Sequence, residues 1–168
     1  MYKVVNKKVK EIFSNFGIVN APIPIEEIIT KLGIKISYAP SIDYSGMIVK
    51  KKDGKALIGV NSNEPYTRAR YTMAHELAHY FFEKASISID HRDNFSRENK
   101  PEKEKRADYF AANLLMPDEL IKKDFFGITK NKVFLEEHLS YLANFYQVSK
   151  EAMNYRLLNL GLISRDIK

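Results

Sequence analysis

The sequence predicts an α+β fold, in which a small, mainly antiparallel three-stranded sheet packs on helices and a helical tail completes the chain. Three observations support this prediction. Apolar residues recur at helical spacing over the first 32 residues, give way to short β-branched segments up to residue 61, and return to helical spacing from residue 64 onward. Strands that lie between runs of helices are typical of the α+β class.

The length of the chain limits the number of domains. With 168 residues, 45% of them hydrophobic, the chain is long enough for one domain with a sizeable core, and a second full domain would be cramped. No repeat, low-complexity tract or obvious linker divides it. We therefore expect one domain over residues 1–168, with a core over about 1–125 and a helical, helix-turn-helix-like subregion over about 131–162.

Helices are predicted wherever apolar residues recur every three or four positions. The first is expected to end at Gly17, because glycine is common where a helix stops. A proline favours the first turn of a helix, and Pro24, Pro101 and Pro117 are placed accordingly. The predicted helices cover about residues 2–16, 24–32, 64–84, 101–116, 117–125, 133–146 and 150–160.

The predicted strands IKISY, SGMIVKK and KALIGVN are short, β-branched and partly alternating. Lys52-Asp53-Gly54, between the last two strands, is typical of a hairpin turn, so these two strands are expected to pair antiparallel. By contrast, ISIDHRDNFSRENK at residues 87–100 is polar and rich in turn-forming residues, which predicts an exposed loop between two helices.

The segment YTMAHELAHYFFEK holds the most specific motif of the chain. On a helix, residues four apart lie on one face about 6 Å apart, so the imidazoles of His75 and His79 can bind one metal ion. Glu76 is rotated about 100° from His75, close enough to reach a water molecule on that ion as a general base. The alternative is a helix that buries two hydrogen-bonded histidines and binds no metal.

Zinc held by two histidines needs a third protein ligand and keeps its fourth position for water. Glu104 is the best candidate, because Glu104 and Asp108 are four apart on a predicted helix and point the same way. One carboxylate can bind the metal, and the other can accept the outer N–H of a ligand histidine. The rivals are Glu102, on another side of that helix, and Asp90 and His91 in the predicted loop. The alternative for Glu104 is an exposed charge paired with a lysine.

Composition excludes several other kinds of site. The chain has no cysteine, which excludes a disulfide framework, a thiolate metal site and a cysteine nucleophile, so nitrogen and oxygen atoms must hold any metal. No apolar run is long enough to cross a bilayer, and we expect a cytoplasmic protein with no membrane partner. A net charge of +6 attracts nucleic acid, but the lysines are spread among acidic neighbours, which favours an ordinary solvated surface.

These motifs resemble those of a known family, the ImmA/IrrE metallo-endopeptidases. The resemblance rests on RARYTMAHELAHYFF, followed at a typical spacing by EKRADYFAANLLMP. It covers residues 46–117 closely and extends more weakly into the tail. Two residues depart from the common pattern: Ala78 stands where the family often has glycine, and Asp108 stands where many members have asparagine.

The resemblance implies a minimal zincin-like domain in which His75, His79 and Glu104 bind Zn²⁺, Glu76 is the catalytic base and Asp108 supports a histidine ligand. It also implies that the substrate is a protein, a helix-turn-helix repressor of the phage or mobile-element type, whose cleavage relieves repression. The alternative function is a non-catalytic, zinc-containing regulatory protein that binds a repressor or DNA.

The tail also allows a DNA-binding interpretation. It is predicted to form a helix, a short turn with Ser149, and a second helix that bears Lys150, Asn154 and Arg156. However, the tail has a large apolar surface and few basic residues, which favours a helical lid packed on the core. DNA binding is therefore the less favoured interpretation.

Two further parts of a peptidase have candidates in the sequence. A substrate polypeptide often lies extended beside an exposed strand edge, and SGMIVKK is predicted to be that strand. The oxyanion that forms during cleavage needs a hydrogen-bond donor. His138 and the ten tyrosines are candidates, although each one is better explained as a surface or packing residue.

Overall fold

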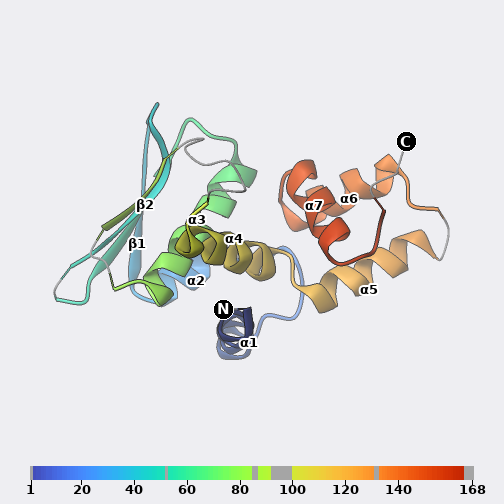
Figure 1. Cartoon of the computed structure of the whole chain (residues 1–168), viewed down its shortest axis with the longest axis horizontal. Coiled ribbons are helices and arrows are strands. Elements are labelled where there is room, and N and C mark those ends of the chain that lie inside the picture. Colours follow the sequence, from blue (N-terminus) through green and yellow to red (C-terminus); the bar gives the residue numbers. More distant parts are fainter. Residues whose placement is uncertain (1, 52, 85–86, 92–99, 131–132, 165–168) are drawn as a thin grey trace.

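The computed structural model describes residues 2–51, 53–84, 87–91, 100–130 and 133–164. Its helices are α1 (Tyr2–Phe16), α2 (Ile25–Lys31), α3 (Tyr66–Phe82), α4 (Glu102–Leu115), α5 (Asp118–Thr129), α6 (Glu136–Tyr146) and α7 (Lys150–Asn159). Its strands are β1 (Ile34–Ala39), β2 (Tyr44–Lys50), β3 (Ala56–Asn61) and β4 (Ile87–His91). Figure 1 shows the sheet at one end of an elongated molecule and α5, α6 and α7 at the other, with α3 and α4 between them.

The α+β class and the predicted helices are confirmed, with helix ends that differ by at most four residues. The largest difference is at α5, which continues through Gly127 and ends where Lys130 adopts a left-handed conformation (φ 48°). α6 begins three residues later than predicted. Helix α7 begins at the predicted Ser149 cap, whose hydroxyl oxygen accepts a hydrogen bond from the Ala152 N–H (3.1 Å).

The predicted number of strands was wrong. Within the described residues the sheet has four strands in the order β1-β3-β2-β4. It is mainly antiparallel, as predicted, because β2 pairs antiparallel with both β3 and β4, whereas β1 pairs parallel with β3. The additional strand β4 lies in the segment that was predicted as an exposed loop, of which residues 92–99 lie outside the described residues. Ile87 and Ile89 remain exposed, so β4 lacks the buried apolar face by which a strand is predicted.

The position predicted for SGMIVKK, at the edge of the sheet, was also wrong. This segment forms β2, which lies between β3 and β4 and bonds to both. Its hairpin with β3 is as predicted: the Lys51 N–H donates to the Lys55 carbonyl (2.8 Å), and Gly54 has a positive φ of 84° that favours glycine. The outer strand on this side of the sheet is β4 instead.

Helix α3 packs against β2 and β3 and is buried along most of its length. Ile48, Ile58 and Val60 are buried on these strands. The approach of helix and strand is close at Gly46 of β2, where an added Cβ would lie 2.2 Å from Cγ2 of Thr72 and 3.4 Å from Cγ of Glu76. Glycine at this position therefore allows α3 to lie directly on the sheet.

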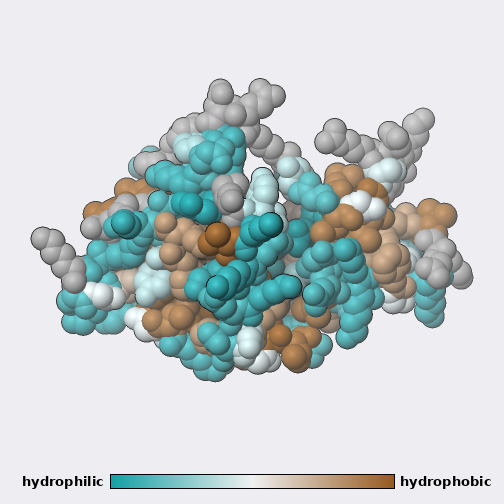
Figure 2. Space-filling model, turned by 60° about the horizontal axis from the view of Figure 1, so that its bottom comes forward, coloured by the Kyte–Doolittle hydropathy of each residue, from teal (hydrophilic) through white to brown (hydrophobic). Residues whose placement is uncertain are grey.

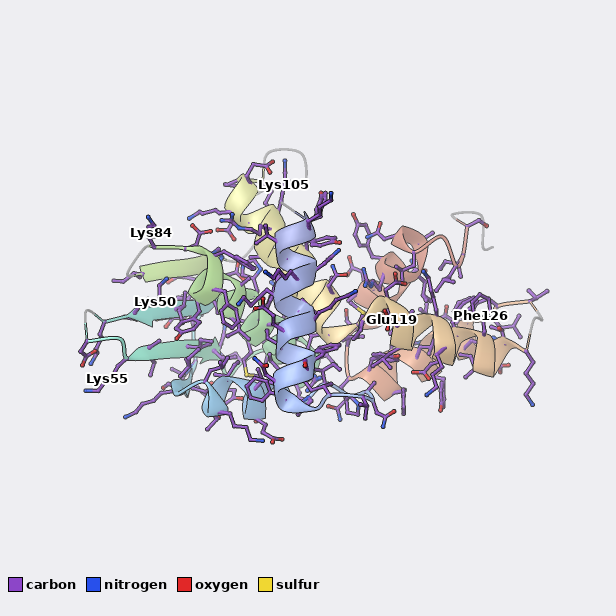
Figure 3. The ribbon with its side chains drawn as sticks, turned by 90° about the horizontal axis from the view of Figure 1, so that it is seen from below. Lys50, Lys55, Lys84, Lys105, Glu119 and Phe126 are labelled. Atoms are coloured by element: carbon purple, nitrogen blue, oxygen red, sulfur yellow. The ribbon has the colours of Figure 1, made fainter. Side chains whose placement is uncertain are left out.

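Helix α1 packs on α4, and Figure 3 shows it crossing the middle of the molecule as seen from below. The same view places Lys50, Lys55 and Lys84 at the sheet end. Lys50 contacts the carbonyl oxygens of His79 (3.5 Å) and Glu83 at the C-terminal end of α3. A cation is favourable there because the last carbonyl groups of a helix carry partial negative charge.

The C-terminal helices pack on the rest of the molecule through a buried arginine. Arg156 of α7 donates from Nε to the Met116 carbonyl (2.9 Å) and from Nη2 to Oδ1 of Asn113 (3.0 Å), both at the end of α4. Arg156, one of the side chains on which the DNA-binding interpretation depends, is therefore bonded within the protein interior. The second basic candidate, Lys150, pairs with Glu136 of α6 (3.2 Å).

The surface of this C-terminal end differs from that of the middle of the molecule. In the view of Figure 2, hydrophobic side chains reach the surface over the end that holds α5, α6 and α7, while hydrophilic ones cover the middle. Exposed side chains here include Phe126, Tyr141, Phe145 and Tyr155. None of the described helices combines the length and the apolar character that a bilayer span requires.

Candidate metal centre and active site

Three predicted ligands meet between α3 and α4. His75 and His79 lie one turn apart on α3, and their Nε2 atoms are 3.2 Å apart. Oε2 of Glu104, on α4, lies 3.0 Å from Nε2 of His75 and 3.4 Å from Nε2 of His79. All three residues are buried. The structure thus forms a group of two nitrogens and one oxygen that could hold a metal ion.

The spacing of these three atoms fits a tetrahedral metal ion. Ligand atoms about 2.0–2.1 Å from such an ion are about 3.3 Å from each other, which is close to the three separations observed here. Two imidazole nitrogens and a carboxylate form one of the common donor sets of catalytic zinc sites. The residues present therefore fit a divalent metal ion.

The His75 ring is held from its outer side by Asp108 of α4. Nδ1 of His75 lies 3.1 Å from Oδ1 of Asp108, so the outer N–H can donate to the carboxylate while Nε2 faces the other ligands. Oδ1 also accepts a hydrogen bond from the Tyr71 hydroxyl (3.0 Å), and Oδ2 accepts one from Nζ of Lys100 (2.6 Å). Asp108 thus lies where a carboxylate can support a histidine ligand.

Glu76 lies on α3 beside the ligand group and is completely buried. Within the described part of the chain, neither of its carboxylate oxygens has a hydrogen-bond partner. A buried carboxylate without a donor is unfavourable, since it has lost its water and gained nothing in return. Both oxygens can therefore still accept hydrogen bonds, for example from a water molecule.

Burial and hydrogen bonds at this site shift several pKa values. Burial raises the pKa of Glu76 to about 8. Burial also disfavours the imidazolium form of His75, but the hydrogen bonds with Asp108 and Glu104 outweigh this effect and raise the pKa of His75 to about 10. For Glu104, the contacts with His75 and His79 outweigh burial and lower the pKa well below its usual range. The group therefore favours a positive charge between the histidines and Glu104, which a metal ion would supply in place of a proton.

The other candidate residues lie outside the ligand group or outside the described residues. Glu102 is exposed and pairs with Lys105 (3.3 Å). The Asp90 side chain lines the same groove as His75, but Asp90 is not part of the ligand group, and the His91 side chain lies outside the described residues. His138, a candidate for oxyanion stabilisation, accepts a hydrogen bond at Nδ1 from the Leu135 N–H (3.0 Å) at the start of α6. Its geometry is that of a helix cap.

One of the candidate ligands, His75, lines a groove of about 1770 Å³. Tyr71, His75 and Asp90 line one part of it, and the groove continues along α4 to α7, where Ala152 and Tyr155 line it. A cavity of this volume exceeds the size that is usual for small-molecule sites, about 300–1,000 Å³. It suits a longer ligand, such as a segment of polypeptide.

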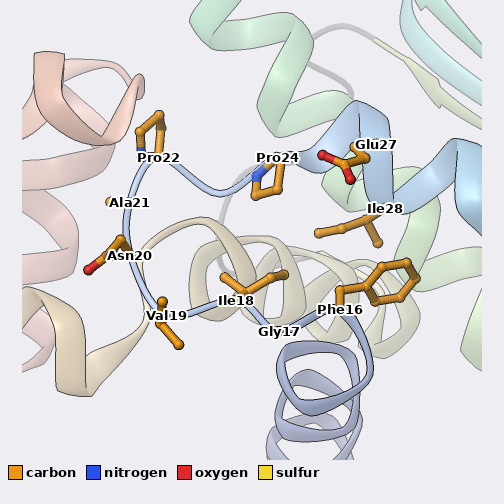
Figure 4. A pocket seen from close by; sticks show the side chains of 10 residues that line it. All are labelled: Phe16, Gly17, Ile18, Val19, Asn20, Ala21, Pro22, Pro24, Glu27 and Ile28. Atoms are coloured by element: carbon orange, nitrogen blue, oxygen red, sulfur yellow. The ribbon is translucent and has the colours of Figure 1, made fainter.

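A smaller cavity of about 320 Å³ lies where the chain leads from α1 into α2 (Figure 4). Apolar side chains, including Phe16, Ile18 and Ile28, form much of its lining, and Glu27 is the charged residue that lines it. It contains none of the predicted site residues. The larger groove is therefore the one that a candidate ligand, His75, lines.

Sequence reasoning missed three residues that shape this site: Gly46, Tyr71 and Lys100. Tyr71 had a usable signal, because it lies four residues before His75 and so shares its face of α3. Lys100 lies before α4, so the periodicity of that helix does not place it beside Asp108, and the close approach at Gly46 depends on the packing of α3 on β2. Neither of these could be read from periodicity.

Comparison with known families agrees with this geometry. A family model, Peptidase M78, described as the IrrE N-terminal-like domain, matches residues 29–158. The match covers both segments that carry the candidate ligands and continues through most of α7, as the weaker resemblance of the tail indicated. No curated protein matches the sequence significantly. The resemblance predicted from the motifs is thereby confirmed, and the chain belongs to the Peptidase M78 family of IrrE/ImmA-type metallopeptidases.

Proposed function

We propose that this protein is a zinc-dependent endopeptidase that cuts a specific protein, a helix-turn-helix repressor, and so relieves repression. One observation carries the proposal. Three buried ligand atoms lie at tetrahedral separations of 3.0–3.4 Å beside Glu76, whose carboxylate has no hydrogen-bond partner in the described part of the chain. Membership of a metallopeptidase family supports the reaction type.

Zinc is the metal that this donor set suits best. His75 and His79 supply imidazole nitrogens and Glu104 supplies a carboxylate oxygen, which leaves a fourth tetrahedral position open. Calcium and magnesium prefer oxygen ligands alone. When bound, zinc supplies Lewis-acid chemistry: it activates a water molecule and polarises the carbonyl of the scissile peptide bond.

The protein residues move the proton and hold the ligands. In the proposed reaction, Glu76 removes a proton from the attacking water as its oxygen bonds to the carbonyl carbon. Glu76 then donates that proton to the amide nitrogen as the C–N bond breaks, which gives a carboxylate and an amine. Asp108 keeps Nδ1 of His75 protonated, so that Nε2 faces the metal.

The groove and the outer strand support a polypeptide substrate. The groove that His75 lines continues along α4 to α7, and its volume of about 1770 Å³ suits a segment of polypeptide. Strand β4 is the outer strand on this side of the sheet, and its residue Asp90 lines the groove together with His75. We therefore assign to β4, in place of β2, the pairing with an extended substrate by main-chain hydrogen bonds.

The identity of the substrate as a repressor rests on the family resemblance. The protein's positive charge and its groove are compatible with many polypeptides, so neither selects a repressor. A candidate substrate is any helix-turn-helix repressor encoded beside this protein's gene. The cleavage products, identified by mass spectrometry, would give the scissile bond.

The test compares the wild type with Glu76→Gln, using metal analysis and cleavage of such a repressor. We expect both proteins to bind one zinc ion and the variant to lose cleavage by roughly 10²–10⁴-fold, the usual contribution of a general base. A wild-type protein that lacks stoichiometric metal would refute the proposed peptidase function. Zinc binding without cleavage of any neighbouring repressor would favour the non-catalytic, repressor-binding function instead.

A further inference from the structure

We propose that Lys100 and Tyr71 are positioning residues for the metal centre, because together they fix the Asp108 carboxylate in the orientation that holds His75. This inference rests on the proposed zinc function, but neither residue belongs to the predicted ligands or to the catalytic base. Lys100 and Tyr71 would act through Asp108 and would touch neither the metal nor the substrate.

The inference starts from the hydrogen bonds that Asp108 accepts. Oδ1 receives the Tyr71 hydroxyl (3.0 Å) and faces Nδ1 of His75 (3.1 Å), and Oδ2 receives the Lys100 ammonium (2.6 Å). Donors on both oxygens restrict rotation of the carboxylate, and the bond from Lys100 is a short, charge-assisted one. The direction of Oδ1 in turn fixes the rotation of the imidazole ring, which aims Nε2 at Glu104 (3.0 Å).

The three groups that contact Asp108 come from different parts of the chain. Tyr71 and His75 lie one turn apart on α3, Asp108 lies on α4, and Lys100 lies just before α4 begins. The contacts therefore connect the two helices that carry the three ligand atoms. Without them, Asp108 could turn towards the groove, which its side chain also lines.

The burial of the two donors distinguishes this arrangement from ordinary surface pairing. The side chains of Lys100 and Asp108 are 24% and 32% exposed, whereas the nearby pair Lys105 and Glu102 is 41% and 76% exposed. Burial, next to the Asp108 charge, raises the pKa of Tyr71 well above its ordinary value, so its hydroxyl keeps its proton and remains a donor. Exposed pairs contribute little, and more buried ones fix geometry more strongly.

The experiment measures the zinc affinity of the purified full chain by competition with a chelator. Lys100→Met should weaken zinc binding about tenfold, the lower end of the range for groups that orient a metal ligand, and Tyr71→Phe should weaken it about threefold. Lys100→Arg keeps the cation and should restore most of the affinity. Lys105→Met is the matched control: it removes the same charge from the same groove but contacts Glu102, and its affinity should stay within about twofold of the wild type.

A double-mutant cycle tests whether Lys100 acts through Asp108. In an Asp108→Ala background, Lys100→Met should cause no further loss of zinc affinity. An equal loss in both backgrounds, or wild-type affinity in Lys100→Met, would overturn the inference and leave the proposed function standing. Wild-type protein that binds no zinc would overturn both. Thermal unfolding of the metal-free variants should show nearly equal midpoints, since the proposed role is in orienting His75 and not in folding.

Discussion

The two ends of the molecule bury polar side chains in different ways. Beside the sheet, both carboxylate oxygens of Glu76, the Thr72 hydroxyl and Nδ1 of His79 are buried without a hydrogen-bond partner in the described part of the chain. At the helical end, Arg156 bonds to a carbonyl and an amide, and the Tyr146 hydroxyl donates to Oδ2 of Asp124 (2.6 Å). The first set is poorly satisfied by the protein, and the second set is well satisfied.

This difference indicates which buried polar groups serve function. A buried polar group without a partner costs roughly 1–3 kcal/mol, more if it is charged, so it lowers stability unless something else binds it. Of these groups, the two oxygens of Glu76 belong to the candidate base and Nδ1 of His79 belongs to a potential metal ligand, so the unsatisfied set includes residues of the candidate site. The satisfied groups at the other end are explained by folding alone.

The largest expected effect is a loss of stability with rising pH in the metal-free protein. Burial raises the pKa of Glu76 from 4.5 to about 8, and hydrogen bonds to carboxylates, opposed by burial, raise the pKa of His75 from 6.5 to about 10. Between pH 6.5 and 8 the folded chain therefore holds up to two protons more than the unfolded chain, and fewer at the ends of this range, where the unfolded imidazole and the folded Glu76 carboxyl are each half protonated. The free energy of unfolding should fall by roughly 3 kcal/mol across this window.

Urea unfolding of chelator-treated protein at several pH values measures this slope. Saturating zinc should largely abolish it, because the metal displaces the proton on His75 and stabilises the Glu76 carboxylate. Metal-free Glu76→Gln should show about half the wild-type slope, since one of the two protons is then absent from the balance. A metal-free wild type whose stability is flat between pH 6.5 and 8 would contradict the contrast between the two ends.

The next effect concerns the contact between helix and sheet at the metal end. Gly46→Ala should lower the free energy of unfolding by about 2–3 kcal/mol, because the new methyl group would lie 2.2 Å from Cγ2 of buried Thr72. Cleavage should fall further than stability explains, since the same substitution displaces α3 and with it Glu76. Denaturant unfolding and cleavage rates measure the two effects. Unchanged cleavage in a folded variant would show that Gly46 serves packing alone.

A smaller effect is expected at the helical end. Arg156→Met should lower the free energy of unfolding by about 2 kcal/mol, since it leaves the Met116 carbonyl and the Asn113 amide without their donor. Zinc affinity should be unchanged. The control on the same helix is Lys150→Met, whose exposed pair with Glu136 contributes less than about 1 kcal/mol. If both substitutions instead abolished a salt-dependent affinity for DNA, the helical end would have to be reinterpreted as a DNA-binding module.

The sequence predicted the helices well, and it placed the candidate ligands on shared helix faces, because both depend on local spacing. The four-residue intervals between His75 and His79, and between Glu104 and Asp108, place each pair on one helix face whatever the rest of the fold does. Hydrogen bonding and burial then brought the two faces together, as the predicted partnership of Asp108 with a histidine required.

What the sequence did not reveal depends on contacts between distant segments. Strand β4 pairs with β2 across about 40 residues of chain, and its exposed Ile87 and Ile89 give no buried face to detect. The same holds for Lys100, whose bond to Asp108 depends on how the chain enters α4. Edge strands and side chains just outside helices lack the periodic signal on which such predictions rest.

The smallest expected effect is that of a glycine substitution at the helical end, which can be compared with the substitution of Gly46 at the other end. Gly127 lies inside α5, where an added Cβ would meet no atom within 4 Å, so Gly127→Ala should raise the free energy of unfolding by about 1 kcal/mol through helix propensity alone. The same substitution at Gly46 is predicted to have the opposite sign. Denaturant unfolding of the two variants side by side checks both, with zinc affinity as a second readout that Gly127→Ala should leave unchanged. A loss of stability in Gly127→Ala would mean that α5 is more tightly packed than its surroundings indicate, and the predicted difference in sign between Gly46 and Gly127 would be wrong.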